Sequence, residues 1–290
     1  MSLSIARCGD LKLDLGECPV WEEANQKLWL MDCRQGRIYS MDRDWNASLE
    51  AKIEPPTGSF ALCADGSLIV SRKETIVRLR EGKEEILAQI EESHPNMRLN
   101  DGAVMPDGSF VVGTMHVFRE LGEEPLGGLY RLSADGRLTR IGRAFGVTNG
   151  PKVSPLDGRF YVCDSTPRQI YSYAINEDGS LSDEKLFAST DSLGSAPDGC
   201  CFDSEGGLWT ALVHAAAIIR FAPDGSVSQR IDLPLAHPAS LCFGGPALDE
   251  LYVTSISDSG RLKAEGPMDG AVLRITGAGY RGLPTPYFGR

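Results

Sequence analysis

A short unit, in which a tight turn precedes an apolar strand-like run, occurs six times along the chain and constrains the fold more than any other feature. Asp-Gly and related pairs tolerate the positive φ that a tight turn requires, and the apolar run that follows predicts a β-strand. The units begin about 40 to 50 residues apart, which is the length of a four-stranded propeller blade. They occupy residues 25–30, 65–70, 107–112, 157–162, 205–210 and 248–253.

Second turns lie between these units, and no segment has a sustained helical period of apolar residues. Evenly spaced turns are also typical of β-sandwiches, but a blade-sized spacing over the whole length favours a propeller. Six blades account for all 290 residues. The sequence therefore predicts an all-β fold, a six-bladed β-propeller with an axial metal site, as a single domain over residues 1–290.

The net charge, the lack of long apolar stretches and the positions of the cysteines indicate which partners and which cellular location to expect. The net charge is −11 and Lys and Arg form no local cluster, which argues against a nucleic-acid partner. No stretch approaches the roughly 20 apolar residues that cross a bilayer, and the N-terminal residues lack the pattern of a secretory signal. The eight cysteines are scattered, without zinc-ribbon spacing. We expect a cytoplasmic protein without membrane association.

Four polar sites interrupt the expected apolar pattern, each about 8 to 12 residues before a repeat unit. Equivalent places in successive blades point toward one axis, so side chains far apart in sequence can meet there. Two carboxylates and two amide oxygens form an all-oxygen donor set, which suits a hard divalent ion. The four residues are Glu17, Asn100, Asn149 and Asp198.

Each site also has an alternative interpretation. Three of the four contain an Asn-Gly or Asp-Gly pair, and such pairs are common turn dipeptides. Glu17 lies in Gly-Glu-Cys-Pro, which is no standard turn. His116 follows Gly-Thr-Met and is a candidate substrate contact. No Gly-x-Ser-x-Gly elbow, P-loop or dinucleotide glycine signature occurs, which disfavours serine hydrolases and nucleotide enzymes.

These motifs resemble those of the SMP-30/gluconolactonase/regucalcin-like family, and the resemblance extends from about residue 11 to the C-terminal end. The details are most similar to bacterial sugar lactonases. The matching segments are Leu15-Gly16-Glu17-Cys18-Pro19-Val20-Trp21, Arg98-Leu99-Asn100-Asp101-Gly102 with Gly113-Thr114-Met115, Thr148-Asn149-Gly150, Pro197-Asp198-Gly199 with Leu208-Trp209, and Cys242-Phe243-Gly244-Gly245.

The resemblance implies one divalent ion held by Glu17, Asn149 and Asp198, with Asp198 also acting as acid and base. It further implies that Arg98 and Asn100 contact the sugar. Calcium is the ion that the ligand types favour, and Zn²⁺, Mn²⁺, Mg²⁺ and Fe²⁺ are alternatives. Animal members carry two acidic residues shortly after Gly-Thr-Met, whereas Val117 and Phe118 stand near those positions here, with Glu120, Glu123 and Glu124 further along. A different sugar preference is expected.

The expected activity is metal-dependent hydrolysis of a sugar-acid lactone, such as glucono-, galactono-, xylono- or arabinono-lactone, by a monomer or weak homodimer. One alternative is a non-catalytic calcium-binding or regulatory propeller with the same ligands. Arg98 and Asn100 discriminate against it, because an ion site alone has no use for a cationic side chain beside its metal. Another alternative is a related propeller that hydrolyses organophosphates or other esters.

Overall fold

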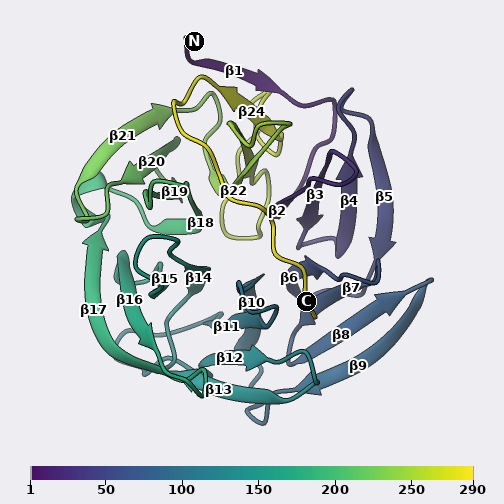
Figure 1. Ribbon diagram of the computed structural model, residues 1–290, viewed down its shortest axis with the longest axis vertical. Coiled ribbons are helices and arrows are strands. Elements are labelled where there is room, and N and C mark those ends of the chain that lie inside the picture. Colours follow the sequence, from purple (N-terminus) through teal and green to yellow (C-terminus); the bar gives the residue numbers. More distant parts are fainter. Residues whose placement is uncertain (1, 290) are drawn as a thin grey trace. The chain divides into compact units, whose positions relative to one another are not determined.

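The computed structural model describes residues 2–289, which form 24 β-strands and one 3-10 helix, Asp191–Leu193. The strands pair into six four-stranded sheets (Figure 1). Within each sheet, neighbouring strands run antiparallel. These sheets are the blades of a six-bladed β-propeller, so the predicted fold class is confirmed. Its axial metal site and its single domain over residues 1–290 stay predictions.

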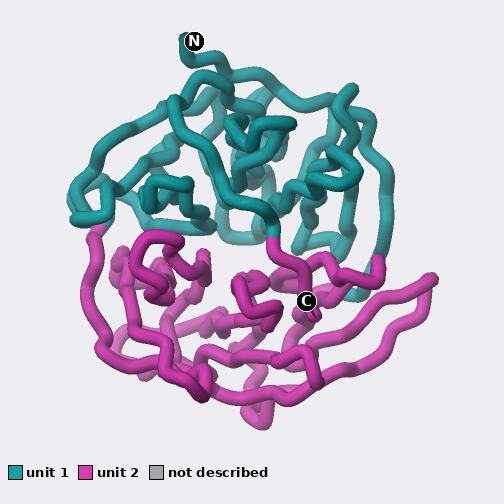
Figure 2. The backbone as a smooth tube through the Cα atoms, in the orientation of Figure 1, with its two compact units in different colours: residues 1–54, 190–285 teal, residues 55–189, 286–290 magenta. Residues whose placement is uncertain are grey.

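The chain forms two compact units, which Figure 2 shows in different colours. Unit 1 comprises Met1–Glu54 and Thr190–Thr285, and unit 2 comprises Pro55–Ser189 and Pro286–Arg290. Each unit contains three of the six sheets, and each is described here by itself.

The sheets of unit 2 follow one another along the chain. The first contains β6 (Thr57–Leu62), β7 (Leu68–Arg72), β8 (Thr75–Arg80) and β9 (Lys83–Gln89). The second contains β10 (Met97–Val104), β11 (Phe110–His116), β12 (Leu129–Leu132) and β13 (Leu138–Gly142). The third contains β14 (Thr148–Val153), β15 (Phe160–Asp164), β16 (Gln169–Ile175) and β17 (Leu181–Ser189).

Unit 1 combines both ends of the chain. One sheet contains β2 (Gly16–Glu22), β3 (Lys27–Asp32), β4 (Arg37–Met41) and β5 (Ala47–Lys52). Another contains β18 (Pro197–Phe202), β19 (Leu208–Leu212), β20 (Ala217–Phe221) and β21 (Val227–Asp232). The last contains β22 (Pro238–Gly244), β23 (Glu250–Ser255) and β24 (Leu273–Thr276), and its fourth strand is the N-terminal β1 (Ser4–Arg7).

The six repeat units of the sequence mark the second strand of each sheet. The turns at Asp65-Gly66 and Asp107-Gly108, for example, lead into β7 and β11. Every residue of the first strands β6 and β18 is buried, whereas fourth strands such as β9 and β21 are mostly exposed. These first strands therefore lie in a much more protected environment than the fourth strands.

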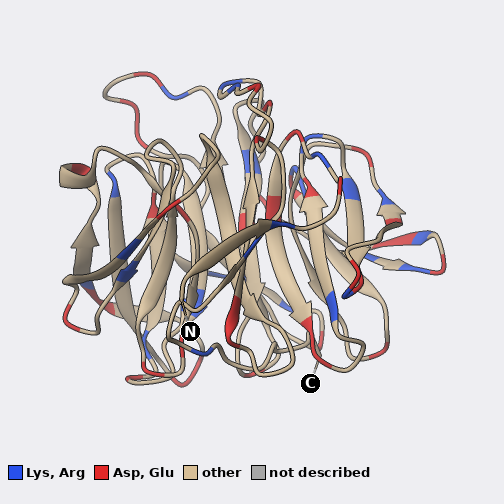
Figure 3. Ribbon diagram, turned by 90° about the horizontal axis from the view of Figure 1, so that it is seen from above, with Lys and Arg blue, Asp and Glu red and all other residues tan. Residues whose placement is uncertain are grey.

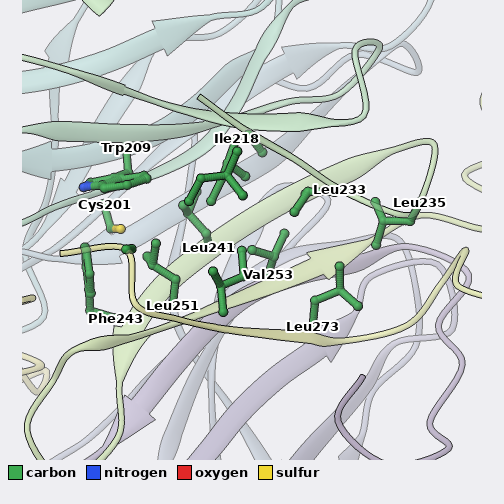
Figure 4. Packing of buried hydrophobic residues seen from close by; sticks show 14 residues of the cluster. Cys201, Trp209, Ile218, Leu233, Leu235, Leu241, Phe243, Leu251, Val253 and Leu273 are labelled. Carbon is green, nitrogen blue, oxygen red and sulfur yellow. The ribbon is translucent and has the colours of Figure 1, made fainter. Parts of the chain in front are cut away.

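Apolar side chains of neighbouring sheets pack against one another within each unit. In unit 1, Trp209 and Ile218 from one sheet meet Leu241, Leu251 and Leu273 from the next (Figure 4). Burial of such side chains is the main stabilising contribution to a fold of this kind.

Charged residues gather in the turns and at strand ends, with both signs interspersed along the ribbon (Figure 3). In the six first strands only six residues carry charge. Four of these are Glu17, Arg98, Asp101 and Asp198, and they lie toward the N-terminal ends of their strands. Over residues 2–289, no helix is both long and apolar enough to traverse a membrane.

Candidate functional site

The first strand of every sheet has a register shift near its N-terminal end. The shifts fall between Glu17 and Val20, Thr57 and Ser59, Leu99 and Gly102, Asn149 and Lys152, Pro197 and Cys200, and Pro238 and Ser240. Such β-bulges bend a strand and redirect its side chains, and they are frequent next to active sites. An irregularity common to all six first strands is therefore a feature of the fold and belongs to no single sheet.

The predicted site residues occupy one equivalent position at these bulges. Across the six strands this position holds Glu17, Gly58, Asn100, Asn149, Asp198 and Ala239. In each strand an apolar residue follows four positions later, namely Trp21, Leu62, Val104, Val153, Phe202 and Phe243. Four oxygen-bearing side chains thus share an equivalent strand position with two small residues.

The interpretation of the Asn-Gly and Asp-Gly pairs as ordinary turns is wrong. Asn149-Gly150 lies inside β14 and Asp198-Gly199 inside β18. Asn100 and Asp101 likewise lie inside a strand, β10. A bulge and a turn both favour residues that tolerate unusual backbone angles, so the dipeptides alone do not distinguish them.

In unit 2 the structure brings Asn100 and Asn149 together. The Nδ2 of Asn100 donates to the Oδ1 of Asn149 at 3.1 Å and to the carbonyl oxygen of Thr148 at 2.8 Å. Asn149 is 5% exposed, and its Nδ2 donates to the Oγ of Ser165 at 2.9 Å. These bonds fix which atom of the Asn149 amide is the oxygen and where it points.

The segment leading into β14 is also held. Asp164, at the end of β15, accepts hydrogen bonds from the backbone N–H groups of Gly146 and Val147, at 3.4 Å each, and from that of Thr166 at 3.2 Å. Burial raises the pKa of the Asp164 carboxyl, while these backbone donors oppose the rise. The carboxylate thus fixes the chain just before Thr148 and Asn149.

Arg98 and His116 lie at the same end of their sheet, because Arg98 pairs with Met115 and His116 with Met97. The Nη1 of Arg98 donates to the carbonyl oxygen of Leu99 at 3.0 Å. The His116 side chain is buried, and within residues 2–289 its Nδ1 has no hydrogen-bond partner.

The chain between β11 and β12 folds back over His116. The Nε2 of His116 lies 3.8 Å from the Oε2 of Glu123, and the Nε of Arg119 donates to the carbonyl oxygen of Glu123 at 2.7 Å. Phe118, which stands near the position where we expected the animal members to carry an acidic residue, is 66% exposed. A carboxylate therefore does lie beside His116, and it comes from further along the loop.

Unit 1 contains Glu17 and Asp198. Asp198 is 8% exposed, and the Oγ1 of Thr210 lies 3.4 Å from its carbonyl oxygen and 3.3 Å from that of Gly199. A Cβ on Gly199 would lie 2.1 Å from the Oγ of Ser240, so only glycine fits beside Asp198. Glu17 is half-buried and pairs with Met31 of β3.

The chemistry of these side chains fits a hard divalent ion. A carbonyl oxygen has two lone pairs, and the Asn100 N–H uses one of those on Asn149 Oδ1, which leaves the other for a cation. Among residues 2–289, no group of three or more His, Cys, Asp and Glu side chains is arranged to bind a metal. The predicted ligand set contains only two such side chains, the carboxylates of Glu17 and Asp198. Its third ligand is the amide oxygen of Asn149, and amide oxygens are also ligands of hard divalent ions.

Two neighbours of the predicted residues were not identified from the sequence. Cys18 follows Glu17 with a φ of 49°, a value that a side chain bearing a Cβ rarely adopts, so the bulge stores backbone strain next to Glu17. Asp101 follows Asn100 and is 8% exposed, with its carboxylate bonded to backbone N–H groups. In the sequence, Cys18 and Asp101 are distinguished only by lying next to Glu17 and Asn100 inside the motifs that contain those residues.

Known proteins resemble this chain over nearly its whole length. The family model described as the SMP-30/Gluconolactonase/LRE-like region matches residues 15–257. Regucalcin of Xenopus laevis is 31% identical, covering 95% of each chain. The 6-deoxy-6-sulfogluconolactonase of Pseudomonas putida is 33% identical, covering 94% of each chain.

Two further relatives extend this similarity. A pentonolactonase of Haloferax volcanii is 30% identical, again covering 94% of each chain. Among solved structures, a luciferin-regenerating enzyme superposes with a TM-score of 0.88 at 26% identity, covering 99% of each chain.

Proposed function

Because the chain belongs to the SMP-30/gluconolactonase/LRE-like family, we propose that it is a metal-dependent lactonase that opens the ring of a sugar-acid lactone. The observation that carries the proposal is the placement of oxygen donors at one equivalent bulge position in four of six first strands. Relatives that are named for their action on sugar lactones support the substrate class.

In this proposal Glu17, Asn149 and Asp198 hold one divalent ion, with calcium favoured by the oxygen ligands. When bound, such an ion polarises a carbonyl group and lowers the pKa of a water molecule. The carboxylates of Glu17 and Asp198 carry two negative charges, which balance the two positive charges of the ion. The third ligand is the neutral amide of Asn149, which its hydrogen bond to Ser165 orients.

The remaining chemistry belongs to the chain. Asp198 accepts a proton from the attacking water as the new bond to the acyl carbon forms. It returns that proton to the ring oxygen when the acyl carbon–ring oxygen bond breaks, which yields the open aldonic acid. Arg98 supplies a planar pair of N–H donors for substrate hydroxyls or developing negative charge, and Asn100 orients the sugar. His116 is a further substrate contact.

The runner-up is a non-catalytic calcium-binding or regulatory propeller, and it draws support from the regucalcins among the relatives. It would use the same three ligands. Arg98 separates the two hypotheses, because a cationic side chain beside a metal site weakens cation binding unless it serves an anionic or hydroxyl-bearing substrate.

Proton release from a panel of aldonolactones, before and after chelation and metal add-back, tests the proposal. We expect rapid hydrolysis of at least one of glucono-, galactono-, xylono- and arabinono-lactone, its loss with chelator and its return with one ion. A tightly bound ion without acceleration on any lactone would favour the calcium-binding alternative. Cytoplasmic location and a monomeric or weakly dimeric state stay predictions.

A further inference from the structure

Asp101 is a buried carboxylate for which the proposed reaction has no role. It lies in the bulge of β10 and is 8% exposed. Its Oδ1 accepts the N–H of Gly102 at 2.8 Å, and its Oδ2 accepts the N–H of Gly150 at 2.7 Å. Burying a carboxylate is costly unless hydrogen bonds compensate, so a side chain placed here must satisfy a specific requirement.

The second of these bonds leaves the sheet of Asp101. Gly150 belongs to β14, the first strand of the next sheet in unit 2, and directly follows Asn149. On the other side of Asn149, the carbonyl oxygen of Thr148 accepts a hydrogen bond from Asn100 at 2.8 Å. The two peptide units that flank Asn149 are thus both held by side chains of the β10 bulge.

We propose that Asp101 is a positioning residue, which fixes the β14 bulge so that the Oδ1 of Asn149 is presented as a metal ligand. Gly150 has a φ of 56°, a conformation that glycine adopts readily and that residues with a Cβ rarely adopt. The charge-assisted bond from its N–H to Asp101 stabilises that conformation. The inference rests on the proposed metal site.

Other first strands show why a carboxylate is used here. The position after the shared bulge residue holds Ser59 in β6 and Ser240 in β22. The Oγ of Ser59 bonds to the Oγ of Ser71 at 2.8 Å and donates to the carbonyl oxygen of Asn100 at 3.0 Å. The serine hydroxyl is therefore a donor to β10, the first strand of the next sheet. At Asp101 two N–H groups must be accepted, which a carboxylate does with its two oxygens.

Metal affinity tests the proposal without relying on catalysis. We would titrate Ca²⁺ into the intact protein by calorimetry, comparing wild type with Asp101→Asn and Asp101→Ser. The serine variant has precedent at Ser59 and Ser240, so the bulge accommodates it. Loss of a residue that orients a ligand weakens metal binding by about 10- to 100-fold, and we expect that loss in both variants.

Asp269→Asn is the matched control. Asp269 is 6% exposed and also accepts two backbone N–H groups, from Ala236 and Gly266, both at 2.7 Å. We expect this variant to lower the thermal midpoint of the metal-free protein while its Ca²⁺ affinity stays within about twofold of wild type. A role of Asp101 in stability alone would give the same result for the Asp101 variants, and would overturn the proposal.

A double-mutant cycle identifies the route of the effect. If Asp101 acts through Asn149, Asp101→Asn weakens Ca²⁺ binding in wild type and adds almost nothing in an Asn149→Ala background. Fully additive losses would overturn the proposal, because Asp101 would then act independently of Asn149. Wild type that binds no divalent ion, with lactone hydrolysis unaffected by chelator, would refute the proposed metal site and this inference with it.

Discussion

Asp198 and Glu17 are the carboxylates on which the proposed chemistry depends, and isosteric amides test them. We expect Asp198→Asn to lower kcat for the best lactone by at least about 100-fold, because general acid–base catalysis alone contributes about 10²- to 10⁴-fold. We expect a loss of similar size from Glu17→Gln, because it removes one of the two charged ligands of the proposed ion. Proton-release assays measure this, with circular dichroism as the check on folding. Asp224→Asn, in the turn before β21, should retain full activity. Unchanged kcat in a folded, metal-loaded Asp198→Asn protein would contradict the assignment.

Gly113 shows how closely the sheets of unit 2 approach one another at the level of a single atom. A Cβ at this position would lie 2.2 Å from the Cγ2 and 2.4 Å from the Cβ of Thr148, the residue before Asn149. Overpacking of this kind costs about 1–3 kcal/mol. We expect Gly113→Ala to lower the free energy of unfolding by that amount in urea titrations. An unchanged urea midpoint would mean that β11 and β14 can separate at no cost.

At the scale of elements, a charge network around the buried Glu250 connects the strands of the last sheet to the loop after β4. Glu250 of β23 accepts hydrogen bonds from Arg43 at 3.0 Å, from Arg274 of β24 at 2.6 Å, and from Tyr252. Burial opposes ionisation of Glu250, but the donors outweigh it and lower its pKa to about 2. The folded state therefore favours the charged carboxylate.

This network predicts a pH dependence of stability. A carboxyl whose pKa is lowered on folding stabilises the protein above its unfolded-state pKa, near 4.5, and that contribution is lost as the pH falls toward 2. We expect Glu250→Gln to lower the free energy of unfolding by about 1–3 kcal/mol at pH 7. The difference between variant and wild type should shrink between pH 4.5 and 2, as measured by urea unfolding. A difference independent of pH would exclude the carboxylate charge as its source.

Most elements could be predicted from the sequence because their signals are local. Asp-Gly turns and apolar runs determine hairpins over a few residues, and the blade-sized spacing then determines how many sheets form. The β-bulges could not be predicted this way. A bulge is defined by the register of two strands, and Asn149-Gly150 has the same local preferences in a turn as in a bulged strand.

The candidate site was predictable to the extent that its residues break the apolar pattern. Glu17, Asn100, Asn149 and Asp198 each do so at the bulge position of a first strand. Asp101 was missed because its partner, Gly150, is 49 residues away in sequence. The Glu123 contact with His116 was missed because it depends on how a loop folds back over the sheet, which no periodicity encodes.

At the scale of the whole molecule, the chain's two ends share a sheet. β1 pairs with β24 over Ser4–Arg7 and Leu273–Thr276, and covers what would otherwise be the edge of that sheet. Deleting residues 2–7 would expose the N–H and C=O groups of β24, which invites pairing with another chain. We expect a lower thermal midpoint, by more than about 5 °C, and concentration-dependent association in size-exclusion chromatography. Deletion of residues 2 and 3 alone is the control, and an equal effect from both deletions would exclude strand loss as the cause.

The pairing of β1 with β24 also sets an order of events during biosynthesis. A ribosome releases β1 first, yet its partner strand emerges only after more than nine-tenths of the chain has been made. The three sheets of unit 2 have their strands in continuous succession and can form while synthesis proceeds. The N-terminal segment must wait unpaired throughout that time, so its short length and mixed polarity protect the nascent protein from premature strand pairing.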